Sequence, residues 1–264
     1  MILYKYISKD SLGYVFGSNG ISIKFTPFCD FNDPFESYGV SIAPHDEGSL
    51  IHLTMRHEIN NKLACLCLSK DPLNVLMWSH YADKHEGFVI GIDTGDAGFE
   101  DEKNLIITAK KGDMDYRAER DKVSVSVTHE NIFDENVSRK LLLNKSLHWA
   151  YENEVRVIKR TALLDNQNGH LIHKVENICA VKELYIGINN DNYKSVIMEN
   201  AYLESLILNG NVKLYLCDFK EGTWDLDKKP ITYHNPIAEH AMHDVFESLK
   251  DIIMAIDRNK VNGD

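Results

Sequence analysis

The chain has 264 residues, of which 44% are hydrophobic and 26% are charged, a composition that excludes a disordered protein. Its net charge of −11 disfavours nonspecific binding to nucleic acid, although a local basic groove is still allowed. The sequence has no run of 18 apolar residues, so no transmembrane helix is predicted. The opening apolar stretch is too short for a signal peptide. We therefore expect a cytoplasmic protein with no membrane partner. The five cysteines include no C-x-x-C pair, so we expect no structural zinc site.

Hydrophobic periodicity predicts a mixed order of elements along the chain. Strands are predicted near 2–6, 21–25, 63–69, 88–92, 104–109, 122–128, 154–160, 170–175, 181–188 and 212–219. Helices are predicted after Ser8 and near 49–62, 71–84, 130–150, 191–208 and 237–257. There is no regular β-α-β alternation and no glycine-rich phosphate-binding motif, so a Rossmann or P-loop domain is not expected. The pattern predicts one mixed α+β domain over residues 1–235, with a C-terminal helix over 236–264 docked on it.

Two motifs near the start combine polar and aromatic side chains. On the opening strand, Tyr4 and Tyr6 share one face and Lys5 points to the other, which is also the pattern of an ordinary edge strand. The segment 31–36 has the letters FNDPFE, which are typical of a turn. Its Asn32 and Asp33 could cap neighbouring backbone or hydrogen-bond a polar ligand, and the sequence leaves both open.

A third motif, at 77–87, places aromatic side chains on one side of a predicted helix. Trp78 and Tyr81 are three residues apart, and His80 lies beside them. A flat ring or a sugar could stack there, and a core-packed aromatic patch is the alternative.

A fourth motif joins a predicted helix to a predicted strand. Lys145, Trp149 and Glu152 have the spacing of one helical face, and from Glu154 the chain alternates, with Arg156 on the same side as Glu154. The two carboxylates thus lie at the junction, where they could edge a cleft. The alternative is a solvated strand face with a Glu–Arg pair.

The densest basic stretch of the chain is interleaved with acidic residues and is a weak footprint for nucleic acid. It consists of Lys103, Lys110, Lys111, Arg117, Arg120 and Lys122.

These motifs occur together, and in this order, in a known family. YKY, FNDPFE, WSHYA-x-x-H-x-G-F and K-S-x-x-W-x-Y-E-x-E-x-R make the chain resemble the family called domain of unknown function 2971, over most of residues 1–190. That name implies no activity.

More distantly, the layout resembles ADP-ribosyltransferases, which carry an E-x-E element on a late strand. The resemblance implies a split β-sheet core with flanking helices. It also implies that Glu154 holds the ribose hydroxyl of NAD and stabilises an oxocarbenium-like transition state, with Tyr6 or Tyr81 stacked on nicotinamide. The chain departs from that pattern, because it has no Ser-Thr-Ser motif and carries Lys5 or Tyr6 where those enzymes have Arg or His.

We therefore expect an NAD-dependent mono-ADP-ribosyltransferase that modifies a macromolecule such as RNA or DNA. The setting would be a bacterial toxin or anti-phage system, with a cognate antitoxin as a further partner. The expected catalytic residues are Glu154, Glu152 and Arg156, with Glu152 orienting the acceptor and Arg156 or Lys145 holding phosphate or bracing the carboxylates. The expected NAD-binding residues are Tyr6, Lys5, Asn32, His80, Tyr81 and Lys145.

Two other functions stay open at this point. A nuclease could hold magnesium with Asp33, Glu152 and Glu154 beside Lys145. A noncatalytic module could sense a nucleotide in the same cleft. All three functions require that Glu154 and at least two of Asn32, His80 and Tyr81 line one cleft.

Overall fold

The computed structural model of the chain describes residues 1–18, 20–36, 40–41, 50–122 and 133–234. The predicted C-terminal helix and most of the strand predicted at 122–128 lie outside these residues, and so does the proposed boundary at 235. No helix within the described ranges is long and apolar enough to cross a membrane.

Strands and helices alternate irregularly along the chain, as the sequence predicts. The strands are β1 Ile2–Ile7, β2 Phe16–Gly17, β3 Gly20–Pro27, β4 Val40–Ser41, β5 Leu63–Ser69, β6 Phe88–Asp93, β7 Asp115–Arg117, β8 Asp121–Lys122, β9 Asn144–Ser146, β10 Glu154–Arg160, β11 Asp165–Gln167, β12 His170–Val175, β13 Val181–Ile186, β14 Lys213–Phe219 and β15 Leu226–Ile231. The α-helices are α1 Leu12–Val15, α2 Leu50–Lys62, α3 Val75–Tyr81, α4 Glu135–Leu142, α5 Tyr193–Met198 and α6 Ala201–Leu208.

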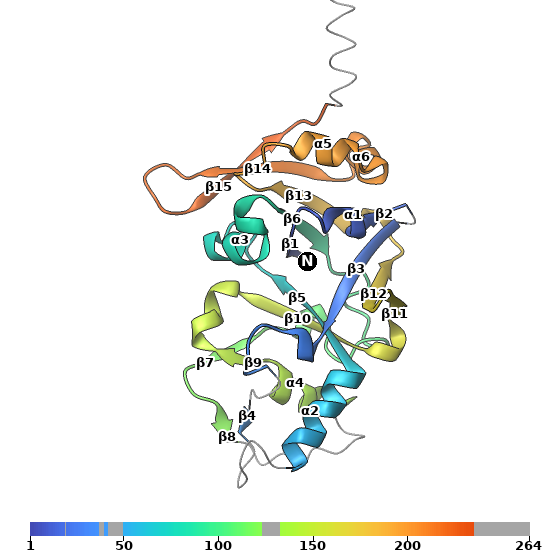
Figure 1. Ribbon diagram of the computed structural model, residues 1–264, viewed down its shortest axis with the longest axis vertical. Helices are drawn as coiled ribbons and strands as arrows, with labels where there is room; N and C mark the ends of the chain where they lie inside the picture. The colour runs from blue at the N-terminus through green and yellow to red at the C-terminus, as the bar shows by residue number, and fades with distance from the viewer. Residues whose placement is uncertain (19, 37–39, 42–49, 123–132, 235–264) are drawn as a thin grey trace, which may run out of the picture.

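The expected α+β class is confirmed. One large mixed sheet has the order β11-β12-β3-β5-β1-β6-β13-β14-β15, with β10 added on β5 and β2 on β3. Within this sheet β13 and β14 are paired parallel, and α5 and α6 form the crossover between them, above the sheet in Figure 1. The other described pairs of the sheet are antiparallel.

The sheet divides at β5. One edge of β5 pairs with β10 along seven residues. The other edge meets β1 only at Tyr4–Ser69, and meets β3 only at Thr26–Cys65 and Pro27–Ala64. Between these two contacts no described strand lies beside β5 on that edge, and β1 and β3 diverge there. Figure 1 shows the result, with β13 to β15 in the upper part of the molecule, β5 and β10 in the lower part, and α3 beside the division.

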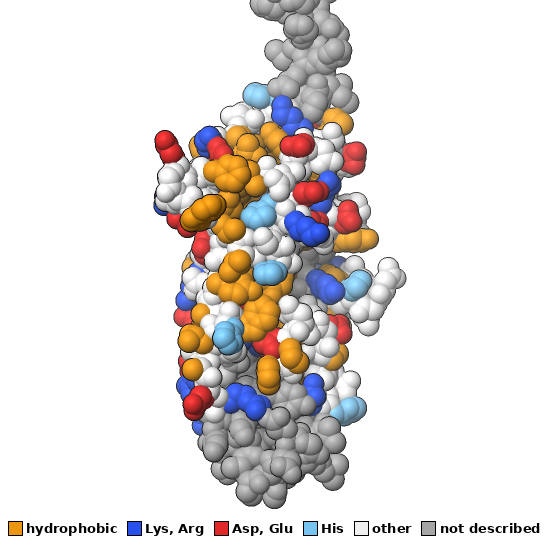
Figure 2. All heavy atoms as spheres, turned by 60° about the vertical axis from the view of Figure 1, so that its left-hand side comes forward, with side chains coloured by type: hydrophobic (Ala, Val, Ile, Leu, Met, Phe, Trp, Pro, Cys, Tyr) orange, Lys and Arg blue, Asp and Glu red, His pale blue; other side chains and the backbone are white. Residues whose placement is uncertain are grey.

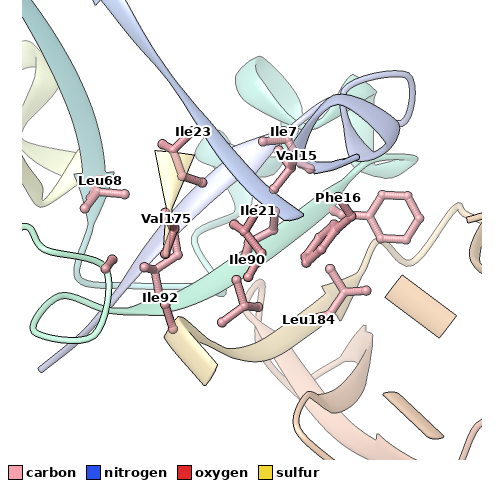
Figure 3. Packing of buried hydrophobic residues seen from close by; sticks show 14 of the residues in the cluster. Ile7, Val15, Phe16, Ile21, Ile23, Leu68, Ile90, Ile92, Val175 and Leu184 are labelled. Carbon is pink, nitrogen blue, oxygen red and sulfur yellow. The ribbon is translucent and has the colours of Figure 1, made fainter. Parts of the chain in front are cut away.

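The main core fills the space between β3 and β12 on one side and β1, β6 and β13 on the other. Figure 3 shows Ile21 of β3 beside Ile90 of β6, and Ile23 and Leu184 belong to the same buried cluster. Burying one such aliphatic side chain stabilises the fold by roughly 1.5–3 kcal/mol. On the opening strand, Ile7 joins this core while Tyr6 faces the opposite side and packs on Trp78 of α3. The predicted alternation of this strand is thus correct.

Two of the predicted helical segments, 71–84 and 191–208, form shorter helices than periodicity alone predicts, because side-chain caps set where α3 and α6 begin. Asn74 accepts a hydrogen bond from Met77 N (3.1 Å), so α3 begins at Val75 rather than at Asp71. In the same way Asn200 accepts one from Leu203 N (2.9 Å), which divides the predicted helix at 191–208 into α5 and α6.

One helix and one strand are predicted to be longer than they are in the structure. The helix predicted over 130–150 is described only as the eight residues of α4, after which the chain forms β9 and a 3₁₀ helix over Leu147–Glu152. The strand predicted at 104–109 is reduced to a single bridge between Ile107 and Ile158.

Candidate functional site

A cleft of about 320 Å³ opens where β1 and β3 diverge from β5. Its walls come from β1, the loop after β3, β5, α3 and the segment from β9 to β10. The residues that line it are Tyr4, Lys5, Tyr6, Thr26, Asp30, Phe31, Asn32, Cys67, Leu68, Ser69, Met77, Tyr81, Lys145, Glu152 and Glu154. Figure 2 views the side of the molecule on which α3 lies in Figure 1, and hydrophobic side chains and histidines gather over its middle.

A local reversal of the chain places the two carboxylates of the fourth motif. The 3₁₀ helix ends at Glu152, and β10 begins at Glu154. Between them Asn153 has left-handed backbone angles, with φ 45° and ψ 48°, a conformation that Asn adopts more readily than most residues. Glu152 and Glu154 therefore point to the same side chain, Lys145 of β9. The predicted helical face of Lys145 and Glu152 is wrong, but the predicted junction does bring the carboxylates together.

Lys145 lies at the centre of three carboxylates. Its Nζ donates to Glu152 Oε2 (2.5 Å) and to Glu154 Oε2 (3.1 Å), and lies 3.9 Å from Glu36 Oε1. It also lies 5.0 Å from the centre of the Trp149 ring. All three carboxylates are buried, so each of these interactions is stronger than it would be in water.

Arg156 supports this group from behind. The side chain is fully buried, and its Nε donates to Glu154 Oε1 (2.8 Å). Its Nη1 and Nη2 donate to the two oxygens of Glu36 at 2.9 and 2.6 Å, a bidentate pair. The rings of Phe28 and Phe31 lie 6.0 and 5.4 Å from the guanidinium carbon. Arg156 therefore does not line the cleft. Of its two expected tasks, holding phosphate or bracing the carboxylates, the contacts of Arg156 match the second.

Gly112 lets the backbone approach Arg156 closely. Its carbonyl oxygen accepts a hydrogen bond from Arg156 N (2.8 Å). A β-carbon at position 112 would lie 1.9 Å from Arg156 O, so no other residue fits without moving the strand that carries the site.

Burial and pairing move the pKa values of the two cleft carboxylates in opposite directions. Burial alone would raise the pKa of Glu154, but the charges of Arg156 and Lys145 outweigh it and lower the pKa to about 2. For Glu152, burial raises the pKa by more than the charge of Lys145 lowers it, so the pKa is raised. For Lys145, the charges of Glu154 and Glu152 outweigh burial and raise the pKa. The site thus contains one carboxylate fixed in its charged form and one that takes up a proton more readily.

Two tyrosines hold this arrangement. Tyr81 of α3 donates its hydroxyl to Glu152 Oε1 (2.7 Å), and Asn32 lines the cleft together with this tyrosine. Tyr116 of β7 accepts a hydrogen bond from Glu154 N (2.8 Å). Burial first, and then the nearby carboxylate charge, raise the pKa of Tyr81, so the hydroxyl stays a donor.

The prediction of one common cleft is confirmed, because Asn32 and Tyr81 line it together with Glu154. Lys5, Tyr6, Lys145 and Glu152 also line it. His80 does not: it lines an adjoining cavity of about 790 Å³ and packs against Tyr81 and Tyr151, at 6.2 and 6.3 Å between ring centres. Trp78 is fully buried in the core, as the structural alternative for that motif predicts.

The cleft and the adjoining cavity form one elongated groove. Both are lined by Lys5, Tyr6, Thr26 and Tyr81. The far part adds polar and titratable side chains from α1, β3, α3 and the turn before β12, among them Lys24, His80, Asp83, Asn168 and His170.

Three residues of the site have no role in the sequence-based prediction. Glu36 ends the FNDPFE motif and is buried although Phe35 beside it is exposed, so no local signal indicates its burial. Cys67 lies in the strand predicted at 63–69, and that pattern predicts only a small core residue, not a residue that lines the cleft. Tyr116 lies in a polar stretch, and no local signal indicates that it reaches Glu154.

Comparison with known proteins supports one of the two resemblances. The model of a family described as "Protein of unknown function (DUF2971)" matches residues 77–157. This confirms the resemblance to domain of unknown function 2971 over that segment, which contains most of α3 and the whole run from Lys145 to Arg156. Neither the curated proteins nor the solved structures contained a match to the chain.

Proposed function

We propose that the protein is an NAD-dependent mono-ADP-ribosyltransferase acting on a macromolecule. The observation that carries this proposal is the pair Glu152 and Glu154, held by Lys145 at one end of an aromatic-lined groove in a divided sheet. The bacterial toxin or anti-phage setting and the cognate antitoxin remain predictions from the distant resemblance.

The dimensions of the groove suit a dinucleotide. Pockets for small ligands and cofactors usually enclose about 300–1,000 Å³ and combine apolar walls with a few placed polar groups. Here the carboxylates lie in the smaller cavity, of about 320 Å³, and the larger cavity of about 790 Å³ continues from it past Tyr6 and Tyr81. A nicotinamide riboside half would fit the first part, and an adenosine half the second.

The two carboxylates have the properties that this transfer requires. Nicotinamide leaves with the electron pair of its bond to the ribose C1′, and positive charge develops on the ribose. Glu154, ionised because its pKa is about 2, would stabilise that charge from a fixed position. The acceptor then forms a bond to C1′ and loses a proton, and Glu152, whose pKa is raised, is the group placed to receive it.

The same geometry disfavours the magnesium nuclease. A divalent cation would need the carboxylate oxygens that now converge on the Lys145 ammonium, within 2.5–3.9 Å of its Nζ. Among the described residues, no group of three or more His, Cys, Asp or Glu side chains is arranged to hold a metal ion. Magnesium would have to displace Lys145 and leave its buried charge without partners, which is costly.

The test is nicotinamide release from NAD, with a mixture of cellular nucleic acids and proteins as acceptors. Glu154→Gln should reduce release by about 10²–10³-fold, the usual effect of losing one preorganised electrostatic partner. The affinity for NAD should change much less, because the charge acts mainly in the transition state. Glu221→Gln, at an exposed position after β14, is the matched control and should release nicotinamide like the wild type.

A second variant separates a loss of activity from a loss of folding. Glu154→Gln is expected to destabilise the fold as well, because the carboxylate is buried and paired with two cations. Tyr81→Phe removes only the hydroxyl that Glu152 accepts from, and should reduce release by about tenfold with the charges still paired. No release by the folded wild type with any acceptor, combined with NAD binding, would identify a nucleotide sensor instead.

A further inference from the structure

The carboxylate cleft and the larger cavity share four lining residues, which we call the neck of the groove. They are Lys5, Tyr6, Thr26 and Tyr81. Burial raises the pKa of both tyrosine hydroxyls, so Lys5 is the charged member of the neck. A ligand that extends from the cleft into the larger cavity therefore passes a cation.

The Lys5 side chain reaches from β1 to β5, across the division of the sheet. Its Nζ donates to Cys67 O (3.2 Å), and Cys67 lies on β5 between the residues that pair with β3 and with β1. An ammonium has three hydrogens to donate, so this bond leaves two for a ligand. Within the described part of the chain no carboxylate pairs with Lys5. The cation is thus held at the neck by an uncharged partner.

A second cation follows along β3. Ser22, Lys24 and Thr26 alternate with core residues on this strand, and all three line the larger cavity. Thr26 is at the neck, and Lys24 lies two residues, about 6.6 Å, farther along the same face. Lys24 is exposed and, like Lys5, has no carboxylate partner among the described residues. Two ammonium groups without an ion pair therefore follow one another along the groove.

The larger cavity contains one carboxylate among its lining residues, that of Asp83. This side chain is in the turn after α3, and its Oδ2 already accepts a hydrogen bond from Lys9 N (2.8 Å). Lys5 and Lys24 together outnumber it, so the lining has an excess of positive charge although the whole chain is acidic.

An aromatic ring is also part of the lining of the larger cavity. Tyr14 lies on α1, which is drawn beside the upper end of β3 in Figure 1. Its side chain is 81% exposed, whereas its neighbours on α1, Leu12 and Val15, are buried in the main core. A flat base can stack on such a ring, and any base has the face to do so.

We propose that the neck and the larger cavity form a site for a nucleoside diphosphate, with the phosphates on Lys5 and Lys24 and the base on Tyr14. This inference rests on the proposed function, because it identifies the part of NAD that supplies the affinity at the same groove. A diphosphate offers one phosphate to each ammonium group, and lysine binds phosphate as a compact charge. ADP therefore binds without the nicotinamide riboside half, and it competes with NAD.

The test is isothermal titration calorimetry with ADP and with adenosine, in the presence of EDTA so that no divalent cation bridges the phosphates. The wild type should bind ADP about 100-fold more tightly than adenosine, about tenfold for each charge-assisted contact. Lys24→Gln should weaken the binding of ADP by about tenfold and leave that of adenosine unchanged. Tyr14→Ala should weaken the binding of both by about tenfold, the scale of losing one stacked base. Lys220→Gln, at an exposed position after β14, is the matched control and should bind like the wild type.

A second measurement separates this inference from the proposed transferase activity. ADP should inhibit nicotinamide release competitively with NAD, and the inhibition should weaken by about tenfold in Lys24→Gln. Equal affinity of the wild type for ADP and adenosine would overturn the inference alone, and so would equal affinity of Lys24→Gln and Lys220→Gln for ADP. Binding of ADP that depends on Lys24, in a protein that releases no nicotinamide, would support the inference and count against the transferase alone.

Discussion

At the scale of single residues, the site is a balanced set of buried charges. Glu36, Glu152 and Glu154 face Lys145 and Arg156 in a region where each side chain is at most 7% exposed. Removing one member leaves a charge without its partner, which typically destabilises a protein by about 3–5 kcal/mol. The residues that we propose position the reaction are therefore also residues that the fold depends on.

This balance predicts a specific loss of stability in acid. The pKa of Glu154 is lowered from 4.5 to about 2, so its pairing contributes stability that is fully present above pH 4.5 and is lost as the pH falls toward 2. Glu152 acts in the opposite sense, because its pKa is raised and protonation relieves the cost of burying its charge. We expect the free energy of unfolding to fall between about pH 4.5 and 2, measured by urea denaturation at a series of pH values.

The comparison with Glu154→Gln isolates this residue. The variant cannot titrate at position 154, so its stability should fall less steeply over the same pH interval, and the two curves should converge in acid. Parallel curves for the variant and the wild type would show that other carboxylates cause the acid sensitivity.

At the scale of elements, the reversal at Asn153 aligns the two carboxylates. A left-handed conformation costs an ordinary residue about 1–2 kcal/mol, and Asn and Gly tolerate it best. We expect Asn153→Ala to lower the free energy of unfolding by about 1–2 kcal/mol, and Asn153→Gly to change it by only a few tenths. Urea denaturation measures both.

Asn168 offers a matched comparison, because it has a similar φ of 52° in the exposed turn between β11 and β12. Asn168→Ala should show the cost of the backbone conformation alone. If Asn153→Gly were as destabilising as Asn153→Ala, the asparagine side chain rather than the backbone angle would be responsible.

The same element shows what periodicity can and cannot predict. Alternation from Glu154 onward correctly predicts β10, because Val155 and Val157 fill one core while Ile158 fills another. The spacing of Lys145 and Glu152 predicts a helical face that does not exist, because those residues lie on β9 and at the end of a 3₁₀ helix. Residues seven apart can meet through a turn as well as along a helix, and sequence spacing does not distinguish the two.

At the scale of the whole molecule, the division of the sheet creates the cleft. Strands 2–6, 63–69 and 154–160 are predicted close to their observed limits, since each is a short segment with a continuous apolar or an alternating pattern. Their pairing is not predictable from the same patterns, because the contact of β1 with β5 consists of one residue pair. β15 carries the letters LDKKPI and has no apolar alternation, so its place at the sheet edge has no local signal.

Ligand-dependent melting tests the whole groove. A ligand that binds only the folded protein stabilises it by RT ln(1 + [L]/Kd), which is about 2.7 kcal/mol at a concentration of 100 Kd. We expect NAD to raise the melting temperature of the purified protein and magnesium chloride to leave it unchanged, measured by differential scanning fluorimetry. Potassium chloride at matched ionic strength is the control. Stabilisation by magnesium without NAD would favour the nuclease.

The position of Lys145 between two cavities has a thermodynamic consequence. Lys145 lines the carboxylate cleft and also a second cavity, of about 210 Å³, beside Phe35. A ligand in the cleft that changes how Glu152 and Glu154 hold the lysine therefore also changes the wall of that second cavity. Linkage requires the effect to be reciprocal, so a ligand in the second cavity that moves the lysine alters the affinity for the first ligand by the same factor. One ammonium group would then make the two binding events cooperative or competitive, with no movement of the sheet.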